Sequence, residues 1–584
     1  MNRFPSAKYI ALFALGVFLL LFVVYYSVLH ADFVHWDDDL LVFDNPSVRT
    51  INFWTLKQIF TTYDPELYIP LTLFTYQLNN IMDGGDPFFF HLTNVVLHAV
   101  SAVVLAGITL ILTRKQSIAV VVGLLFAVHP LNVEAVSWIS ARKDLLSMIF
   151  FLLSIFWYLL SQDSNKKKWY YYSLFFFVCA LLSKVIAITL PVVLILLDWQ
   201  RGKELRFSLL RNKVPYFIIS IIFGVVALIG KAGQSSVTTL HETILMAFRS
   251  TIFYIEKIIF PVHLSVIYPE SGVISLANPV FSVSAFLVIV ISVVIYFFRK
   301  KYRILVVGWL FFLITLAPTY PLYRKGFEGG DVYFASDRYV YIPSIAIILL
   351  LIVGIYYFTQ RWRHGFVAIS TILIIMCSWL SYKQAHVWEN SESLFTNAIN
   401  LYPHAQAARN NLGTAYYLEG RLNEAEQQFL EAIAVRPLAS TYSNLGSLYR
   451  RKGDFPQSLS MYQTALQIDP ADRDAYFGLG ILFAQTGRTD DSALAYKRAI
   501  ELRPEDASSH MNLGVLHLQQ GNVNAAIEQY LFALKYDPFY VNAYFNLGMA
   551  YKNIGRLQDA REAFANALRY DPSMQPAKDQ LEAL

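Results

Sequence analysis

The side chains that could perform acid–base chemistry in this chain stand close together near its beginning. Three consecutive aspartates, Asp37, Asp38 and Asp39, follow an apolar stretch that runs from about residue 9 to 29. A positioned carboxylate can take the proton of an attacking hydroxyl when its pKa is raised only modestly. A solvated loop can carry the same residues, so the acidic run by itself leaves both interpretations open.

Later turns predicted to face the same side as the aspartates bring complementary charges. Ionisable groups at the depth of a membrane are costly unless they are paired or functional, so several on one side predict a shared polar cavity. A carboxylate beside cations at a lipid surface suits a deprotonated acceptor and a lipid-phosphate leaving group. Internal pairing among these charges is the alternative. The groups are His129, Glu134, Arg142, Asp144, Lys184, Asp337 and Arg338.

Apolar helices must position these groups. The 584 residues are 56% hydrophobic and only 15% charged, and the apolar excess lies before residue 383, which a single water-solvated core does not require. Eleven apolar stretches predict membrane spans, several of them short. They lie at roughly 9–29, 91–113, 118–128, 145–161, 170–183, 185–198, 215–230, 279–298, 304–318, 342–358 and 365–382.

Basic clusters between the apolar stretches predict the topology. They all fall on one side if segment 243–260, which carries Arg249, Glu256 and Lys257, lies at the membrane interface instead of crossing. The positive-inside rule then places the N-terminus in the cytoplasm, and an odd number of spans places the C-terminal half outside. The formal net charge is only +5 and the clusters are short, so we assign no nucleic-acid role.

The cysteines provide little evidence for a disulfide or a metal site. Cys179 and Cys377 both stand inside apolar runs, which excludes a disulfide framework or a zinc site in the soluble parts. We assign no metal ligands and no certain cofactor, although a divalent cation that helps a phosphate leave stays open. The array has no cysteine, and the chain has no usable Asn-x-Ser/Thr site, which favours a bacterial inner membrane, with the periplasm outside, over the endoplasmic reticulum.

The second half of the chain is a repeat. From Ala408 onward, a Leu-Gly pair recurs about every 34 residues, a second glycine follows it, and a proline closes each unit. This is the tetratricopeptide pattern, in which helical hairpins stack into a superhelix with a concave groove. We predict a membrane domain at 1–382, a linker and capping helix at 383–407, and five repeats plus a C-terminal cap at 408–584. The expected fold class is therefore all-α, a polytopic membrane bundle followed by an α-solenoid.

A column of asparagines marks the predicted groove. The residue before Leu-Gly is asparagine in four units and Gly478 in the third, and the four are Asn411, Asn444, Asn512 and Asn546. The column resembles the asparagine ladder of the nucleocytoplasmic O-linked glucosamine transferases, whose side-chain amides hold an extended peptide. An amide both donates and accepts, so it can bind a backbone without reading side chains. Consensus filling of a helix face is the equal alternative.

Several stretches together resemble one family over essentially the whole chain: Trp36–Asn45, Tyr68–Thr72, Phe90–His98, His129–Glu134, Arg142–Leu146, Leu182–Lys184 and Arg338–Ser344. They are similar to the transmembrane and tetratricopeptide repeat proteins, which are type C glycosyltransferases related to the protein O-mannosyltransferases. The resemblance implies a polyprenyl-phosphate-linked sugar donor, usually mannose. It also implies inverting transfer to serine or threonine hydroxyls of an acceptor protein.

The resemblance assigns roles to the charged residues. The family's acidic pair falls on Asp37, the expected general base, and Asp38, its expected support, while Asp39 stands at a variable position. Guanidinium and ammonium groups suit a phosphate. The donor-phosphate candidates are Arg338, Lys184 and Arg142, and His129 and Glu134 are expected either to orient the site or to cap a re-entrant turn.

Two departures from the family pattern put donor identity in doubt: Ile69 stands where relatives often have arginine, and Val185 where they often have an acid. Two other classes of protein remain. A membrane-tethered scaffold would need one span rather than eleven, and a transporter would carry its charges at mid-span rather than at the outer ends.

Overall fold

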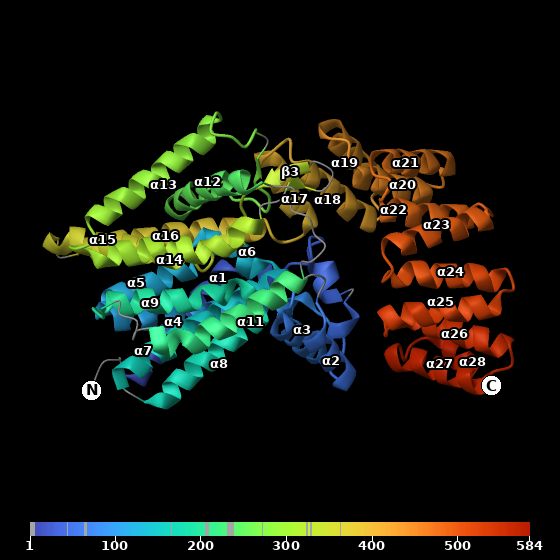
Figure 1. Cartoon of the computed structure of the whole chain (residues 1–584), viewed down its shortest axis with the longest axis horizontal. Helices are drawn as coiled ribbons and strands as arrows, with labels where there is room; N and C mark the ends of the chain where they lie inside the picture. Colours follow the sequence, from blue (N-terminus) through green and yellow to red (C-terminus); the bar gives the residue numbers. More distant parts are fainter. Residues whose placement is uncertain are drawn as a thin grey trace. The chain divides into compact units, whose positions relative to one another are not determined.

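The computed structural model describes residues 6–43, 45–63, 67–164, 166–204, 210–230, 239–270, 272–322, 325–326, 330–362 and 364–584. The predicted all-α architecture is confirmed, apart from one small sheet. The chain divides into two compact units, Met1–Ala408 and Arg409–Leu584. Figure 1 shows both units in colours that follow the sequence.

Every apolar stretch predicted from the sequence forms a helix in the first unit. Figure 1 shows α14, α15 and α16 lying side by side in this bundle, and they pack in that order. The long apolar helices are α1 Ala7–Val24, α4 Pro87–Thr113, α5 Gln116–Ala127, α7 Arg142–Ser164, α8 Lys167–Ser183, α9 Leu190–Gln200, α11 Val214–Gly230, α13 Pro279–Phe297, α14 Arg303–Leu316, α15 Ser344–Phe358 and α16 Gly365–His386.

Fewer of these helices than expected are long enough to cross a membrane. Among the described residues seven pass on length and apolarity, against the eleven predicted. An eighth results if α5 and α6 (Val133–Ser137) form one span bent by 51°. Proline begins the turn after α5, and Lys184 separates α8 from the next helices, so an apolar run is divided into pieces shorter than a full span.

The loops at one end of the bundle are themselves folded. The loop after α1 holds α2 (Phe53–Thr61) and α3 (Pro70–Asp83), both begun by good helix-starting features, an asparagine cap and a proline respectively. The three strands β1 (Pro269–Glu270), β2 (Lys325–Gly326) and β3 (Gly330–Tyr333) form an antiparallel sheet in the order β1-β3-β2. Pro269 is paired with Tyr333.

The segment expected at the interface is the amphipathic helix α12 (Leu240–Ile259), which packs against α13. Its charges have partners: Arg249 lies 3.9 Å from the Glu270 carboxylate, and the Lys257 ammonium donates to the Val262 carbonyl at 2.9 Å. Pairing of this kind reduces the cost of placing charge beside apolar surface.

Segment 388–402, which lies in the predicted linker and capping helix at 383–407, packs within the first unit. It forms α17 (Ser391–Leu401), whose Ser391 hydroxyl accepts from the His35 backbone N–H at 2.9 Å. The Asn397 amide donates to the Leu264 carbonyl at 3.0 Å, and the Phe395 ring lies 5.9 Å from that of Trp36. Helix α17 is therefore a support of the loop that carries the aspartates.

The second unit consists of stacked helical hairpins, which Figure 1 shows in chain order. The Leu-Gly glycine is required by packing: a Cβ at Gly480 would lie 2.5 Å from the Tyr496 ring. The second glycine, such as Gly453 with φ 81°, adopts the left-handed conformation that ends each first helix. The helices are α18 Gln406–Leu418, α19 Leu422–Val435, α20 Ala439–Lys452, α21 Phe455–Ile468, α22 Arg473–Gln485, α23 Thr489–Leu502, α24 Ala507–Gln519, α25 Val523–Tyr536, α26 Val541–Asn553, α27 Leu557–Tyr570 and α28 Gln575–Glu582.

Candidate functional site

Asp38 is a buried carboxylate held by three hydrogen bonds. One oxygen accepts from the Val34 backbone N–H at 3.1 Å. The other accepts from the Ser140 backbone N–H at 2.9 Å and from the Ser140 hydroxyl at 2.5 Å. Burial raises the pKa of Asp38 to about 6, although these hydrogen bonds act to lower it. Asp38 therefore fastens the acidic loop to the segment that precedes α7.

Asp37 is placed differently from its neighbour. Its side chain is half-buried, and in the described part of the chain its carboxylate makes neither a hydrogen bond nor an ion pair. It interacts electrostatically with Lys143 at the start of α7. A carboxylate that is fixed through its backbone but keeps its oxygens unoccupied can approach a hydroxyl of a bound molecule.

Lys143 is a component of the site that the sequence reasoning missed. Its side chain is buried, and its ammonium lies 5.2 Å from the centre of the Trp138 ring. It interacts with Asp37, Lys184, Arg338 and Asp144, so its charge is common to the whole cluster. The available signal was its position in the Arg-Lys-Asp run that begins α7, of which the sequence analysis singled out the flanking arginine and aspartate.

Two of the predicted cations are paired with acids. The Lys184 ammonium donates to the Asp144 carboxylate at 2.6 Å, and Arg338 donates through Nη1 to Glu134 at 2.5 Å. Each keeps donors for a ligand, because in the described residues Lys184 uses one N–H and Arg338 uses only Nη1. The two cations are also joined through Tyr339, whose ring lies 6.0 Å from the Lys184 ammonium and 5.0 Å from the Arg338 guanidinium.

Two of the cationic groups lie over the indole ring of Trp138. The Arg338 guanidinium lies 4.7 Å from its ring centre and the Lys143 ammonium 5.2 Å. Trp388, at the end of the last membrane helix, stacks on it at 6.3 Å. Cations favour an aromatic face, and the contact is strongest where water is excluded. Trp138 thus holds two positive charges near each other without neutralising them.

Arg142 is placed away from any ligand. The side chain is completely buried, and it donates to Asn94 at 2.9 Å, to Asn79 at 2.5 Å and to the Phe90 carbonyl at 2.8 Å. Its guanidinium also lies 4.7 Å from the Tyr76 ring centre. With these protein partners, Arg142 ties α3 and α4 to the start of α7, and we propose that it positions the site instead of contacting phosphate.

His129 and Glu134 have separate tasks. His129 caps the turn after α5 by accepting from the Leu131 N–H at 3.4 Å, and its other nitrogen meets the Ile258 carbonyl at 3.0 Å. Glu134 instead accepts from Arg338 and from the Asp337 N–H at 2.8 Å. Burial and the Glu134 charge raise the pKa of Asp337. We propose that Glu134 orients Arg338, whereas His129 maintains the turn.

The asparagine column lies on the first helices of the repeats, with all four side chains half-buried. Asn444 donates to Asn410 of the preceding repeat at 3.1 Å, and Asn546 donates to the Met511 sulfur at 3.6 Å. The gap in the third unit has a steric cause: a Cβ at Gly478 would lie 2.3 Å from the Tyr462 ring.

No group of three or more histidine, cysteine, aspartate or glutamate residues that could hold a metal ion occurs among the residues described.

The fold and the polar site define a class: a multi-pass membrane protein with a tetratricopeptide repeat array. Two tetratricopeptide repeat family models match the second half of the chain, one at residues 443–507 and 511–575 and the other at 406–436. Such repeats are protein-interaction modules. The solved tetratricopeptide structure of YrrB is 21% identical, covers 32% of this chain and 98% of its own, and gives a TM-score of 0.27.

The particular resemblance is to protein O-mannosyl-transferases. Human "Protein O-mannosyl-transferase TMTC1" is 26% identical over 72% of this chain and 55% of its own length. "Protein O-mannosyl-transferase F38B6.6" of Caenorhabditis elegans is 22% identical over 71% of this chain and 61% of its own. The predicted resemblance to the transmembrane and tetratricopeptide repeat proteins is confirmed. The chain spans a little over half the length of these relatives.

Proposed function

We propose that this chain is a membrane glycosyltransferase that moves a sugar, most simply mannose, from a polyprenyl-phosphate donor to serine or threonine hydroxyls of proteins. The printed names of the relatives support mannosyl transfer to protein oxygen. The observation that carries the proposal is the Asp37 carboxylate, which makes no hydrogen bond or ion pair in the described residues and interacts with the buried Lys143. Lys143 in turn interacts with Lys184 and Arg338. We place the site and the repeats on the outer face, in the periplasm of a bacterium or, alternatively, in the endoplasmic reticulum lumen.

The chemical step divides the work between the acid and the cations. The acceptor oxygen attacks the anomeric carbon from the face opposite the phosphate while Asp37 takes the hydroxyl proton, and the bond from that carbon to the phosphate oxygen breaks. The anomeric configuration is therefore inverted. Asp38 does not share the proton, because both its oxygens are already occupied by Val34 and Ser140.

The leaving polyprenyl phosphate gains negative charge as the bond breaks. Arg338 can offer a planar fork of N–H groups and Lys184 a point charge, while Lys143 adds a cation with no acid bonded to it in the described residues. Preorganised cations in a site that excludes water stabilise such charge more strongly than water does. We therefore assign the donor phosphate to Arg338, Lys184 and Lys143.

The repeats would recruit the acceptor. The half-buried amides of Asn411, Asn444, Asn512 and Asn546 can exchange hydrogen bonds with an extended peptide. Backbone recognition of this kind would accept many sequences, as an enzyme acting on several proteins requires.

Transfer of radiolabelled mannose from polyprenyl-phosphate-mannose to protein tests the proposal in membranes that contain the intact chain. The Asp37→Asn variant should lose transfer by about 100-fold or more, because it removes only the proton acceptor. Asp39→Asn is the matched control, since Asp39 is a neighbouring, half-buried aspartate that bonds only its own loop, at Leu40.

Equal labelling by the intact chain and Asp37→Asn would show that Asp37 is not the general base. No labelling with mannose or several other sugar donors would overturn the enzyme and favour a scaffold.

A further inference from the structure

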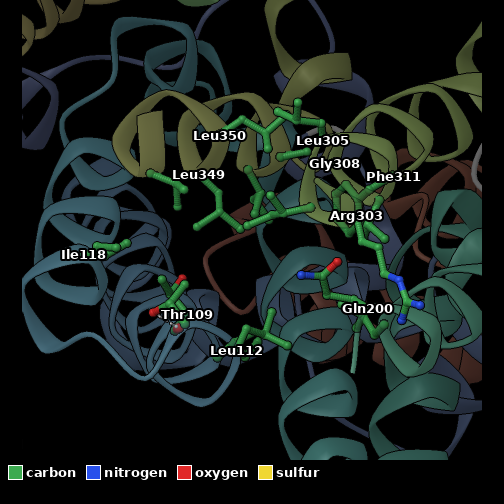
Figure 2. Close-up of a pocket in the computed structure, with 18 of the residues that line it drawn as sticks. Thr109, Leu112, Ile118, Gln200, Arg303, Leu305, Gly308, Phe311, Leu349 and Leu350 are labelled. Atoms are coloured by element: carbon green, nitrogen blue, oxygen red, sulfur yellow. Dashed lines mark hydrogen bonds between the residues drawn. The ribbon is translucent and has the colours of Figure 1, made fainter. Parts of the chain in front are cut away.

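A large cavity lies in the membrane bundle away from the polar site. Its volume is about 1080 Å³, and it is lined by residues of α4, α5, α7, α9, α14 and α15. Figure 2 shows Leu305, Leu349 and Leu350 on one side of the space and Thr109 and Leu112 on the other. Most of its lining is aliphatic, which is suited to a hydrocarbon chain.

Four cations line one end of this cavity: Lys115, Lys300, Lys301 and Arg303. None of them forms an ion pair within the described residues. Lys115 and Arg303 lie over aromatic rings, at 5.8 Å from Tyr356 and 5.9 Å from Trp199, so their charges remain available. Like charges held together without a counter-charge favour an anion between them.

Gln200 adds a second polar signal at the same end. Figure 2 shows its amide beside the cavity, near Arg303. Its side-chain oxygen is buried without a hydrogen-bond partner in the described structure, although buried polar atoms are normally satisfied. A headgroup hydroxyl would supply the missing donor.

The cavity has the length of one leaflet of a bilayer. Its α15 lining runs from Ile345 to Tyr357, which is about 18 Å at the rise of an α-helix. Half of a bilayer's hydrocarbon core is about 15 Å thick. The turns that carry the four cations are those that the charge pattern places on the cytoplasmic side.

We propose that this cavity is a binding site for an anionic glycerophospholipid of the inner leaflet. Its acyl chain would fill the aliphatic space, its phosphate would lie among the four cations, and a headgroup hydroxyl would donate to Gln200. The site does not depend on the enzymatic proposal. We favour an acyl chain because the cavity lining spans about 18 Å, close to half of a bilayer's hydrocarbon core.

Two glycines permit a matched test. Gly354 lines the cavity, and a Cβ there would meet nothing within 4 Å, so we expect a leucine side chain at this position to occupy part of the cavity. Gly16 on α1 is exposed, lies outside the cavity lining, and is equally unobstructed. Both substitutions improve helix propensity, so neither is expected to prevent folding. Only Gly354→Leu should displace an acyl chain.

The measurement is native mass spectrometry of the purified, delipidated full chain titrated with phosphatidylglycerol, phosphatidylcholine or polyprenyl phosphate. We expect one phosphatidylglycerol to bind the wild-type chain and Gly16→Leu, and Gly354→Leu to lose it by at least about tenfold. Replacing Lys300, Lys301 and Arg303 by alanine should weaken binding by on the order of a hundredfold. Alanines at the exposed Lys166, Lys167 and Lys168 provide the charge-matched control.

Three results would overturn the proposal. Equal phosphatidylglycerol binding by both leucine variants would place the lipid elsewhere. Equal affinity for phosphatidylcholine would remove the role of the cations. Displacement of phosphatidylglycerol by polyprenyl phosphate at lower concentration would assign the cavity to the isoprenoid lipid instead.

Discussion

Ser140 donates two hydrogen bonds to the same oxygen of Asp38, one from its backbone N–H at 2.9 Å and one from its hydroxyl at 2.5 Å. The two residues are 102 positions apart in the chain. This single contact fixes the acidic loop against the segment from which Trp138 and Lys143 extend. The unoccupied carboxylate of Asp37 is therefore positioned by its neighbour, which itself does no proton transfer.

Asp38 should make the stability of the chain depend on pH. Its pKa is about 6 in the folded chain and 3.8 ordinarily, so the folded state binds the proton more tightly. The contribution of Asp38 to stability is then greatest below about pH 4, and it falls by about 3 kcal/mol as pH rises through 6. Asp38→Asn should remove this decrease, which thermal unfolding of the detergent-purified chain between pH 4 and 7 can measure.

The effect of Asp38 is the difference between the pH profiles of the wild-type chain and Asp38→Asn, because other groups titrate in the same range. Asp39→Asn alters the same loop and should leave the wild-type pH profile in place. If Asp38→Asn also unfolds with the wild-type profile, burial of the Asp38 carboxylate does not determine the pH dependence.

Lys143 and Lys184 should respond oppositely to replacement by methionine. Lys184→Met leaves the buried Asp144 carboxylate without its partner at 2.6 Å, which should cost about 3 kcal/mol of stability. Lys143→Met removes a buried cation that has no bonded acid in the described residues. The free energy of unfolding of the Lys143→Met chain should stay unchanged or rise by about 1 kcal/mol.

Mannose transfer should nevertheless fall in both variants, because both cations are assigned to the donor phosphate. Denaturation midpoints and transfer rates of the same preparations separate the two effects. A Lys143→Met chain that is as destabilised as Lys184→Met, or that keeps full transfer, would make Lys143 a structural residue only.

The sequence predicted the repeats better than the membrane half. The glycine and proline positions recur in phase in five units, which predicts the same hairpin in each. In every unit the Leu-Gly glycine lies against an aromatic ring, as Gly480 does against Tyr496. Apolarity along the membrane half predicts which segments are helical but not where they break. Breaks at Pro130 and Lys184 depend on capping and on pairing with distant residues, so only seven or eight helices among the described residues reach the length of a full span.

For the candidate site, the sequence selects residues by their type, and the fold supplies the contacts among them. Internal pairing was one alternative for these charges, but residue order alone does not select Glu134, 204 positions earlier, as the partner of Arg338. Nor does it separate His129 from that pair. Bonding partners also decide which cation can bind a ligand. Arg142 and Lys143 are both buried, but Arg142 donates to Asn94 whereas Lys143 lies over the Trp138 ring, and only the folded chain shows this difference. Adjacent positions at a helix start point in different directions, and tertiary packing determines those directions.

The asparagine column should bind peptide without contributing much stability. Asn444→Ala removes one hydrogen bond to Asn410, which contributes about 1 kcal/mol. Crosslinking of an acceptor peptide to the full chain should nevertheless fall several-fold, because the amide would no longer reach the peptide backbone. Thr464→Ala is the control, since Thr464 is half-buried on a second helix and bonds only Ser460 of its own helix. Equal crosslinking by both variants would support consensus filling of the helix face.

Restoring the missing asparagine at Gly478 should fail for a steric reason. Its Cβ would lie 2.3 Å from the Tyr462 ring, which fills the space where the other repeats carry an amide. Gly478→Asn should therefore destabilise the array by about 1–3 kcal/mol, the usual cost of overpacking. Combined with Tyr462→Leu, the same asparagine should cost less than the sum of the two single changes, because the leucine removes the ring. Limited proteolysis of the full chain measures this coupling. Simple additivity would show that Tyr462 does not exclude the side chain, and that the gap in the column has another origin.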